Sequence, residues 1–229
     1  MTLENASSPK SPLRVAYLCD ADPRDRNLYS GGNARLFDAL STRFENIHIL
    51  SQGWGWAEPV RRLVLALPEP IILRAKWRLH LLLSSVIARA VRKELEQQQF
   101  DVLFCAYSFH SLYGLKPSYP ITTVFTSDAT PSVYKHSEIG QAFDSFFSLS
   151  RKFDHLIVKA ETQVFQSTDL LLWPSNWIKN DAEKWFELTP GHSQVVPWGA
   201  NFPDPGILAD APQLVAGNPV RILLVGRDW

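Results

Sequence analysis

The chain has 229 residues, of which 45% are hydrophobic and 20% charged, and its 23 basic and 23 acidic side chains balance. This composition is typical of a globular protein with a sizeable core, and the balanced charge gives no reason to expect nucleic acid as a partner. Cys19 and Cys105 lie in separate apolar runs, which favours reduced core thiols of a cytosolic protein over a disulfide framework or a metal site. The polar residues 1–12 lack the apolar segment of a signal peptide, and we expect them to be disordered.

The first predicted unit is a strand, a loop, a helix and a second strand, at residues 13–19, 20–30, 33–40 and 47–50. Gly31 and Gly32 precede the helix, where α/β folds commonly bind ligands and where free amide groups attract anions. The motif is not GxGxxG, and no acidic residue ends the second strand, which disfavours a dinucleotide. The alternative is that both glycines only form the turn into the helix.

Residues 60–93 are basic and amphipathic, with a single acidic side chain, Glu69, and a long helix is predicted from about 71 to 98. The charges exclude a membrane-spanning helix but suit a helix that lies on anionic lipid, as a peripheral contact at the inner membrane face. The alternative is a domain helix with its apolar side against the sheet and its basic side in water.

Two further strands, at 101–106 and 120–125, are each followed by polar residues. His110 follows the first of them, and Ser127, Asp128 and Thr130 follow the second. In a parallel sheet these loops emerge at the same edge as the loop at 20–32. A carboxylate, hydroxyl groups and a histidine can therefore converge there without being close in sequence.

Asp128 is the first candidate for a catalytic residue, because a carboxylate at the end of a strand can orient or partly deprotonate a hydroxyl group. The alternative is an N-cap of the following helix, which Asp128 or Thr130 would serve equally well. His110 is the second candidate, against the alternative of a surface or hydrogen-bonded core histidine. Ser127 and Thr130 are candidates for substrate contacts through their hydroxyl groups.

The apolar segment with Phe143, Phe146 and Phe147 is predicted to be core, or else to wall an apolar acceptor, and a helix is predicted at 151–168. The apolar run at 170–173 then predicts a strand buried on both faces of a parallel sheet.

Ser175 is placed to cap the next helix, which Pro190 and Gly191 should end. A stripe at helical spacing should face the sheet; it consists of Ile178, Ala182, Trp185 and Phe186. A last strand is predicted at 194–197, with a sharp turn at Gly199. The tryptophans of this part are expected to pack inside it: Trp173, Trp177, Trp185 and Trp198.

Residues 201–219 are rich in proline and glycine and are predicted to be a linker. Residues 220–225 predict a strand with four residues after it. A strand that opens a domain leaves unpaired backbone groups if no domain follows, so we expect the chain to be cut short.

The segments DLLLWPSNW at 169–177, VVPWGAN at 195–201 and VRILLVGR at 220–227 together resemble the retaining GT-B glycosyltransferases of family 4. The resemblance extends over most of 13–229. It implies a Rossmann-like acceptor-binding domain at 13–200, a linker at 201–219, and the first strand of a donor-binding domain at 220–229. It also implies transfer of a sugar from a nucleotide-sugar donor to a sugar or lipid acceptor with retention of configuration.

In that family a Gly-Gly loop lines the cleft between donor and acceptor, which by resemblance assigns substrate binding to Gly31 and Gly32; we add Gly199. Many members have a histidine just after the strand at 120–125, where this chain has Thr126, Ser127 and Asp128. The resemblance implies no cofactor and no metal held by an Asp-x-Asp motif. The alternative to the enzyme is a non-catalytic binding or interaction module that keeps the fold, and in either case we expect residues 1–229 alone to be inactive.

Overall fold

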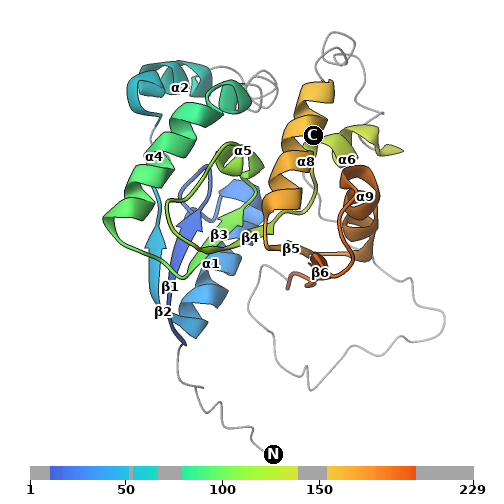
Figure 1. Ribbon diagram of the computed structural model, residues 1–229, viewed down its shortest axis with the longest axis horizontal. Coiled ribbons are helices and arrows are strands. Elements are labelled where there is room, and N and C mark those ends of the chain that lie inside the picture. The colour runs from blue at the N-terminus through green and yellow to red at the C-terminus, as the bar shows by residue number, and fades with distance from the viewer. Residues whose placement is uncertain (1–10, 52–53, 67–78, 139–153, 200–229) are drawn as a thin grey trace, which may run out of the picture. The chain divides into compact units, whose positions relative to one another are not determined.

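The computed structural model describes residues 11–51, 54–66, 79–138 and 154–199, and these residues contain a six-stranded sheet (Figure 1). Its strand order is β2-β1-β3-β4-β5-β6, and every neighbouring pair is parallel. The strands are β1 (Ser11–Leu18), β2 (Phe44–Ile49), β3 (Val102–Ala106), β4 (Thr122–Thr126), β5 (Leu170–Trp173) and β6 (Ser193–Val195). The predicted α/β, Rossmann-like class with a parallel sheet is confirmed.

Helices connect the strands. They are η1 (Leu28–Gly31), α1 (Gly32–Arg43), η2 (Gly55–Ala57), α2 (Glu58–Leu65), α4 (Ser84–Gln97), α5 (Phe109–Leu112), α6 (Pro131–His136), α8 (Asp154–Ser167) and α9 (Asn176–Phe186). Several predictions fall on residues outside the described part. They concern residues 1–10, 67–78, 139–153, which include Phe143, Phe146 and Phe147, and 200–229.

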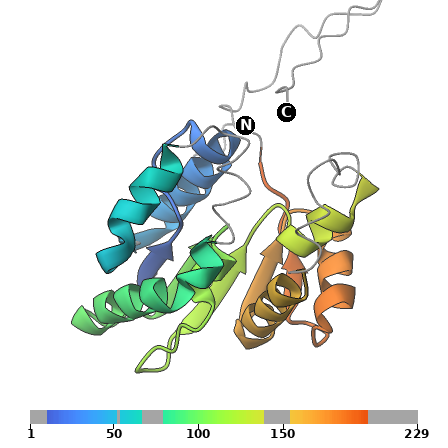
Figure 2. The ribbon, with the colours of Figure 1, turned by 90° about the horizontal axis from the view of Figure 1, so that it is seen from above.

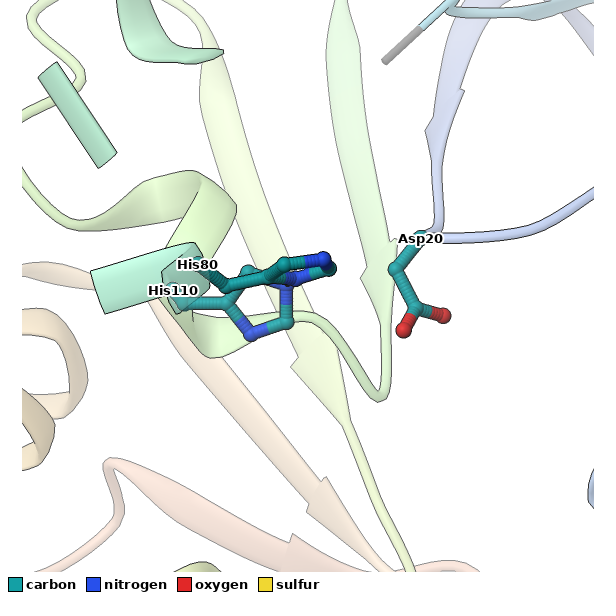
Figure 3. Close-up of side chains that lie close together, drawn as sticks. All are labelled: Asp20, His80 and His110. Carbon is teal, nitrogen blue, oxygen red and sulfur yellow. The ribbon is translucent and has the colours of Figure 1, made fainter. Parts of the chain in front are cut away.

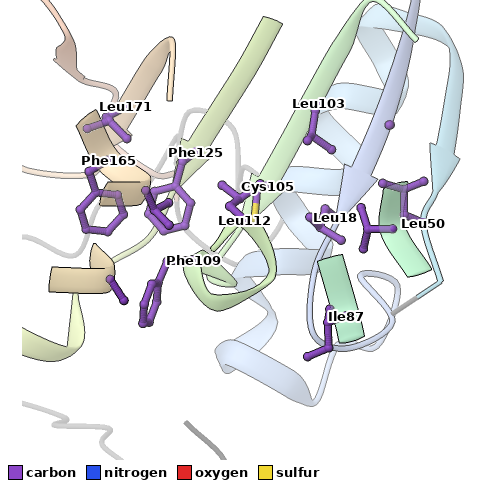
Figure 4. Packing of buried hydrophobic residues seen from close by; sticks show 14 of the residues in the cluster. Leu18, Leu50, Ile87, Leu103, Cys105, Phe109, Leu112, Phe125, Phe165 and Leu171 are labelled. Carbon is purple, nitrogen blue, oxygen red and sulfur yellow. The ribbon is translucent and has the colours of Figure 1, made fainter. Parts of the chain in front are cut away.

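Two apolar clusters cover the two faces of the sheet. On one face, side chains of α4, α5, α8 and α9 pack against alternate strand residues such as Leu103, Phe125 and Leu171 (Figure 4). Viewed from above, α4 in green and α8 in gold run along this side of the sheet (Figure 2). On the other face, α1 packs Phe37 edge-on against Tyr17, with ring centroids 5.3 Å apart. The alternation arises because successive strand side chains point to opposite faces.

β5 is less enclosed than its apolar sequence predicted. Leu171 and Trp173 are fully buried, whereas Leu170 and Leu172 on the opposite face are only half-buried. The reason is that α1 packs on the side of the sheet formed by β1 and β2 and gives little cover to β5. Burial on both faces was therefore predicted wrongly for this strand.

The unit after β5 follows its sequence closely, with three corrections. The first is Trp177, which was predicted to pack inside this unit but is 48% exposed. Ser175 caps α9, accepting a hydrogen bond from the Ile178 amide at 3.5 Å, as predicted. Ile178, Ala182 and Phe186 are fully buried, four residues apart on one line. Trp185 stands beside that line; it is 37% exposed and packs on His136. The helix also ends at Phe186, before the predicted Pro190, because Glu187 adopts the left-handed conformation with φ of 50°.

The predicted continuous helix from 71 to 98 is broken within its described part. Residues 79–82 are helical, Leu83 departs from helical geometry with ψ of 7°, and α4 begins at Ser84. Two serines, Ser84 and Ser85, start the new helix, and serine side chains compete for backbone hydrogen bonds in helix interiors. The basic stretch is thus divided between separate helical segments.

Both cysteines are buried and unpaired, as predicted. Burial raises the pKa of the Cys19 thiol to about 12 and raises that of Cys105 as well. Neither thiol is therefore a thiolate at neutral pH, which fits a packing role.

Candidate functional site at the carboxyl edge of the sheet

The strand order creates a switch point between β1 and β3. From β1 the chain crosses to β2 on one side, and from β3 onward each new strand is added on the other side. Open α/β sheets bind ligands outside the carboxyl ends of the strands at such a point. Here the loop at 20–32 and the residues that follow β3 lie next to each other.

Aromatic rings connect these loops. Tyr29 stacks on Tyr107, with ring centroids 4.1 Å apart and planes 17° apart. The Trp198 ring lies 5.5 Å from that of Tyr107. A methyl group at Gly32 would come within 3.0 Å of the Tyr107 hydroxyl oxygen, so this glycine permits the close approach of the loop after β3. The structure therefore brings Gly31 and Gly32 together with the ends of β3 and β6.

Backbone strain is concentrated at the same place. Of the four described non-glycine residues with positive φ, three are Tyr29 (51°), Ser30 (52°) and Tyr107 (62°). Gly31 follows in the left-handed region with φ of 77°. Each such residue costs about 1–3 kcal/mol when it is not glycine, and such residues cluster at functional sites. The loop conformation thus marks the same place as the ring contacts. We call this place, formed by the loop at 20–32 with Tyr107 and Trp198, the β1–β3 crevice.

Asp128 follows β4 and is exposed at this edge. One of its carboxylate oxygens accepts a hydrogen bond from the Ala129 amide at 2.9 Å. Nearby protein atoms still remove enough water to raise the pKa of this carboxyl group, and the Asp128 charge in turn contributes to the raised pKa of Tyr107, after burial. Tyr107 and the end of β4 are neighbours, because the Tyr107 amide donates a hydrogen bond of 2.9 Å to the carbonyl oxygen of Thr126.

The N-cap of α6, the alternative role considered for Asp128, is Thr130. Its hydroxyl oxygen accepts a hydrogen bond from the Val133 amide at 3.2 Å and so caps α6. Ser127 is also buried and donates to the carbonyl oxygen of Ala129 at 2.7 Å. Both hydroxyl groups therefore hold the loop around Asp128, and their predicted substrate contacts stay predictions.

Gly199 is the last described residue, next to Trp198 at the crevice. A side chain there would meet no described atom within 4 Å, and its φ lies outside the positive range. The turn does not require a glycine at this position, and its substrate contact stays a prediction.

His110 lies deeper than Asp128. It is 2% exposed in α5, its Nε2 atom is 3.0 Å from the Ser108 hydroxyl, and it is hydrogen-bonded to Nδ1 of His80. Asp20, which follows β1, is also buried and accepts a hydrogen bond from the Tyr29 hydroxyl. One ligand atom from each of Asp20, His80 and His110 lies within 4.8 Å of the others, so these three side chains could hold a metal ion (Figure 3).

Sequence reasoning selected His110 but missed His80 and Asp20. His80 precedes His110 by 30 residues, on a separate helical segment, and no motif connects them. The available signal was the position of Asp20 and His110 after strands that proved to be neighbours.

Carboxylates at the opposite edge of the sheet have structural partners. Asp101 and Asp169 line a surface hollow there with Arg14 and Tyr119. Each carboxylate accepts a hydrogen bond of 2.7 Å from the backbone amide of a strand residue, Arg14 or Thr123. These groups fasten the strand starts, so the hollow is a weaker candidate than the carboxyl edge.

Within the described residues, no helix is long and apolar enough to cross a membrane. The predicted contact surface at 60–93 is described in part, and large apolar side chains are exposed in and beside it. They are Trp56 (75%), Val60 (41%), Leu63 (69%) and Leu82 (77%).

Comparison with known proteins gives one family. The model of Glycosyltransferase Family 4 matches residues 33–202, which is well over half of the chain and includes all strands from β2 to β6. No curated protein matches the chain.

Proposed function

The chain belongs to glycosyltransferase family 4, and from this we propose that the carboxyl edge of its sheet binds the acceptor in a sugar-transfer reaction. By the family resemblance, the donor is a nucleotide-diphosphate sugar, the acceptor is a sugar or a lipid, and the product keeps the configuration of the donor, as in a retaining hexosyltransferase. The described residues then form the acceptor-side domain.

The observation that carries this proposal is the convergence of distant segments at one crevice. Gly32 approaches Tyr107, and Tyr107 approaches Trp198. The Tyr107 amide is hydrogen-bonded to Thr126, two residues before Asp128. Aromatic rings with a few polar groups are typical of a small-molecule site. A ring such as that of Tyr107 can cover the apolar face of a sugar while a carboxylate binds its hydroxyl groups.

Asp128 is the group that we propose to contact the acceptor. Its carboxylate accepts a hydrogen bond from the attacking hydroxyl and takes up part of the proton as that oxygen bonds to the anomeric carbon and the bond from this carbon to the phosphate oxygen breaks. A raised pKa makes the carboxylate a better base at neutral pH. His110 was predicted as a second catalytic residue; because it is buried, we propose that it positions the loop after β3.

We expect residues 1–229 to bind the acceptor without transferring sugar, because in this family the nucleotide sugar binds mainly to a second domain. The test is binding of sugar and lipid acceptors by the wild-type chain and by Asp128→Asn, with Asp181→Asn on α9 as a matched control. Loss of a hydrogen bond to a charged group costs about 1.5–3 kcal/mol, so Asp128→Asn should bind roughly ten- to a hundredfold more weakly. Equal binding by the two variants, or donor-dependent transfer by residues 1–229, would contradict the proposal.

Peripheral membrane contact through 60–93 is a further part of this proposal. It is supported by Leu63, which is 69% exposed and follows Arg62 on α2, and by Leu82, which is 77% exposed. Vesicle flotation with anionic lipid tests it, and unchanged flotation of Leu63→Glu would count against this surface.

A further inference from the structure

We propose that Asp20, His80 and His110 form a binding site for one divalent transition-metal ion, with zinc as the first candidate. The three ligand atoms lie within 4.8 Å of one another, and all three residues are buried. The site does not depend on the proposed function, because it is argued from the ligand geometry alone.

The fold brings the three side chains together through neighbouring elements. β1 and β3 are paired, with Leu18 opposite Cys105, so Asp20 and His110 leave the sheet side by side. His80 comes from the helical turn at 79–82 and packs edge-on against Trp54, with ring centroids 4.7 Å apart. The His80 and His110 rings are themselves 4.1 Å apart (Figure 3).

The donor set selects the class of metal. Two imidazoles and one carboxylate suit zinc and the neighbouring transition metals, whereas magnesium and calcium prefer oxygen ligands alone. With both imidazoles neutral, the carboxylate leaves one positive charge of a divalent ion to be balanced. Three protein ligands leave a fourth position of a tetrahedral zinc ion open.

Binding requires a small and balanced rearrangement. Nδ1 of His80 and Nε2 of His110 now form a hydrogen bond, so one of them carries a proton. The metal ion takes the place of this shared proton, which moves to the other nitrogen of the same ring, and both imidazoles stay neutral. Two nitrogen ligands at about 2.0–2.1 Å from a tetrahedral zinc ion are about 3.3–3.4 Å apart. The two hydrogen-bonded imidazole nitrogens therefore have to move slightly apart, while the Asp20 oxygen moves toward them.

The surroundings resemble the outer shell of a metal site. The Ser108 hydroxyl lies 3.0 Å from Nε2 of His110, the atom that would bind the metal ion, and 3.0 Å from the Ser111 hydroxyl, to which it can turn. The Tyr29 hydroxyl donates to the Asp20 carboxylate. Hydrogen bonds of this kind orient ligands, and their loss weakens metal affinity about 10- to 100-fold. A bound ion would join the loop after β1 to α5 and to the turn at 79–82, and so fix the β1–β3 crevice.

The test is metal binding by the full chain without a histidine tag, measured by competition between zinc and a chromophoric chelator. We expect one ion per chain, with His80→Gln and His110→Gln each weakening binding by about 100-fold or more and Tyr29→Phe by about tenfold. His136→Gln is the matched control, because this exposed histidine is hydrogen-bonded to the Ser132 carbonyl oxygen and is not part of the cluster. Wild-type protein that holds no stoichiometric zinc, or equal affinities of all variants, would overturn the proposal.

A measurement on wild-type protein covers the case in which a histidine variant does not fold. X-ray absorption of the zinc-loaded chain should show nitrogen and oxygen neighbours only, with the multiple-scattering pattern of imidazole. A sulfur neighbour at about 2.3 Å would overturn the assigned ligands and indicate Cys19, whose sulfur lies 3.7 Å from Asp20. Since no sugar substrate enters these experiments, their failure is distinct from failure of the proposed function.

Discussion

The two halves of the sheet differ at their carboxyl edge. After β1 and β3 the backbone is strained, with positive φ at Tyr29, Ser30 and Tyr107. After β4 and β5 the chain enters helices whose first turns are capped in the ordinary way by Thr130 and Ser175. Strain at one half and regular capping at the other show that the backbone departs from ordinary geometry around β1 and β3, whereas the backbone after β4 and β5 follows the usual rules.

Buried polar groups show the same contrast. Around β1 and β3, Asp20, His80 and His110 form a compact cluster of metal-binding groups. In the second half, Glu161 of α8 is fully buried and accepts hydrogen bonds from the Ser132 hydroxyl and from its amide, the latter at 3.3 Å. Glu161 thus joins α8 to the start of α6, whereas the cluster at β1 and β3 has the side chains of a metal-binding site.

The largest expected effect tests the stabilising half. Trp173 is fully buried between Phe125 and Phe165, with ring centroids 6.0 and 5.8 Å away. Trp173→Ala should lower the free energy of unfolding by about 3–5 kcal/mol, because it leaves a large cavity. The measurement is urea denaturation followed by circular dichroism.

Trp177→Ala is the matched control, because Trp177 is 48% exposed on α9. Its effect should stay within about 0.5 kcal/mol. Equal losses for the two variants would show that the interior beneath β5 does not carry the stability that we assign to it.

The second-largest expected effect is a pH dependence of the free energy of unfolding that arises from Glu161. Burial raises the pKa of its carboxyl group from 4.5 to about 8, against hydrogen bonds from Ser132 and Thr130 that lower it. Between these two values the folded chain binds one more proton than the unfolded chain, so stability falls as the pH rises. From pH 5.5 to 7.5 this one group should reduce the free energy of unfolding by about 2–3 kcal/mol.

The comparison of wild type with Glu161→Gln isolates this contribution. The variant should lose the pH-dependent part and keep the contribution of every other titrating group, whereas Glu45→Gln, at an exposed position of β2, should behave as wild type does. Parallel pH profiles for wild type and Glu161→Gln would mean that Glu161 is ionised in the folded chain.

The sequence was a good guide where local rules govern the structure. The apolar run from Leu170 to Trp173, the cap at Ser175 and the line of Ile178, Ala182 and Phe186 all follow from periodicity and capping, and all are found. The errors concern how far neighbouring elements bury a side chain and where a helix ends. The exposure of Trp185 depends on what packs beside α9. The left-handed conformation at Glu187 could not be predicted, because such a helix end is normally signalled by a glycine and this position has none.

For the site, the sequence could predict which edge of the sheet its residues lie at, because that follows from the topology, but not how they contact one another. A parallel sheet sends the loops after β1, β3 and β4 to one edge, which was enough to expect Gly31, His110 and Asp128 there. The depth of each residue, however, is set by packing between distant segments. The stacking of Tyr29 on Tyr107 and the contact of His80 with His110 have no local signature, so neither could be read from spacing.

The smallest expected effect is the loss of stability on replacing a left-handed glycine, and it tests whether the strained loop matters for binding. Gly31 and Gly114 both have φ of 77°, the first at the crevice and the second in the turn after α5. Replacing either with alanine should cost about 1–2 kcal/mol, because a Cβ atom disfavours the left-handed region. Thermal unfolding of Gly31→Ala and Gly114→Ala measures this cost.

The two variants should nevertheless differ in acceptor binding. A Cβ atom at Gly114 meets nothing within 4 Å, whereas one at Gly31 lies 3.4 Å from the Arg26 carbonyl oxygen, in the loop that carries Tyr29. Relief of strain at Gly31 therefore shifts Tyr29 from Tyr107 and should weaken acceptor binding, while Gly114→Ala binds as wild type does. If equal losses of stability came with equal binding, the positive φ angles at the crevice would be a feature of the turn alone, and the contrast between the two halves of the sheet would rest on its side chains.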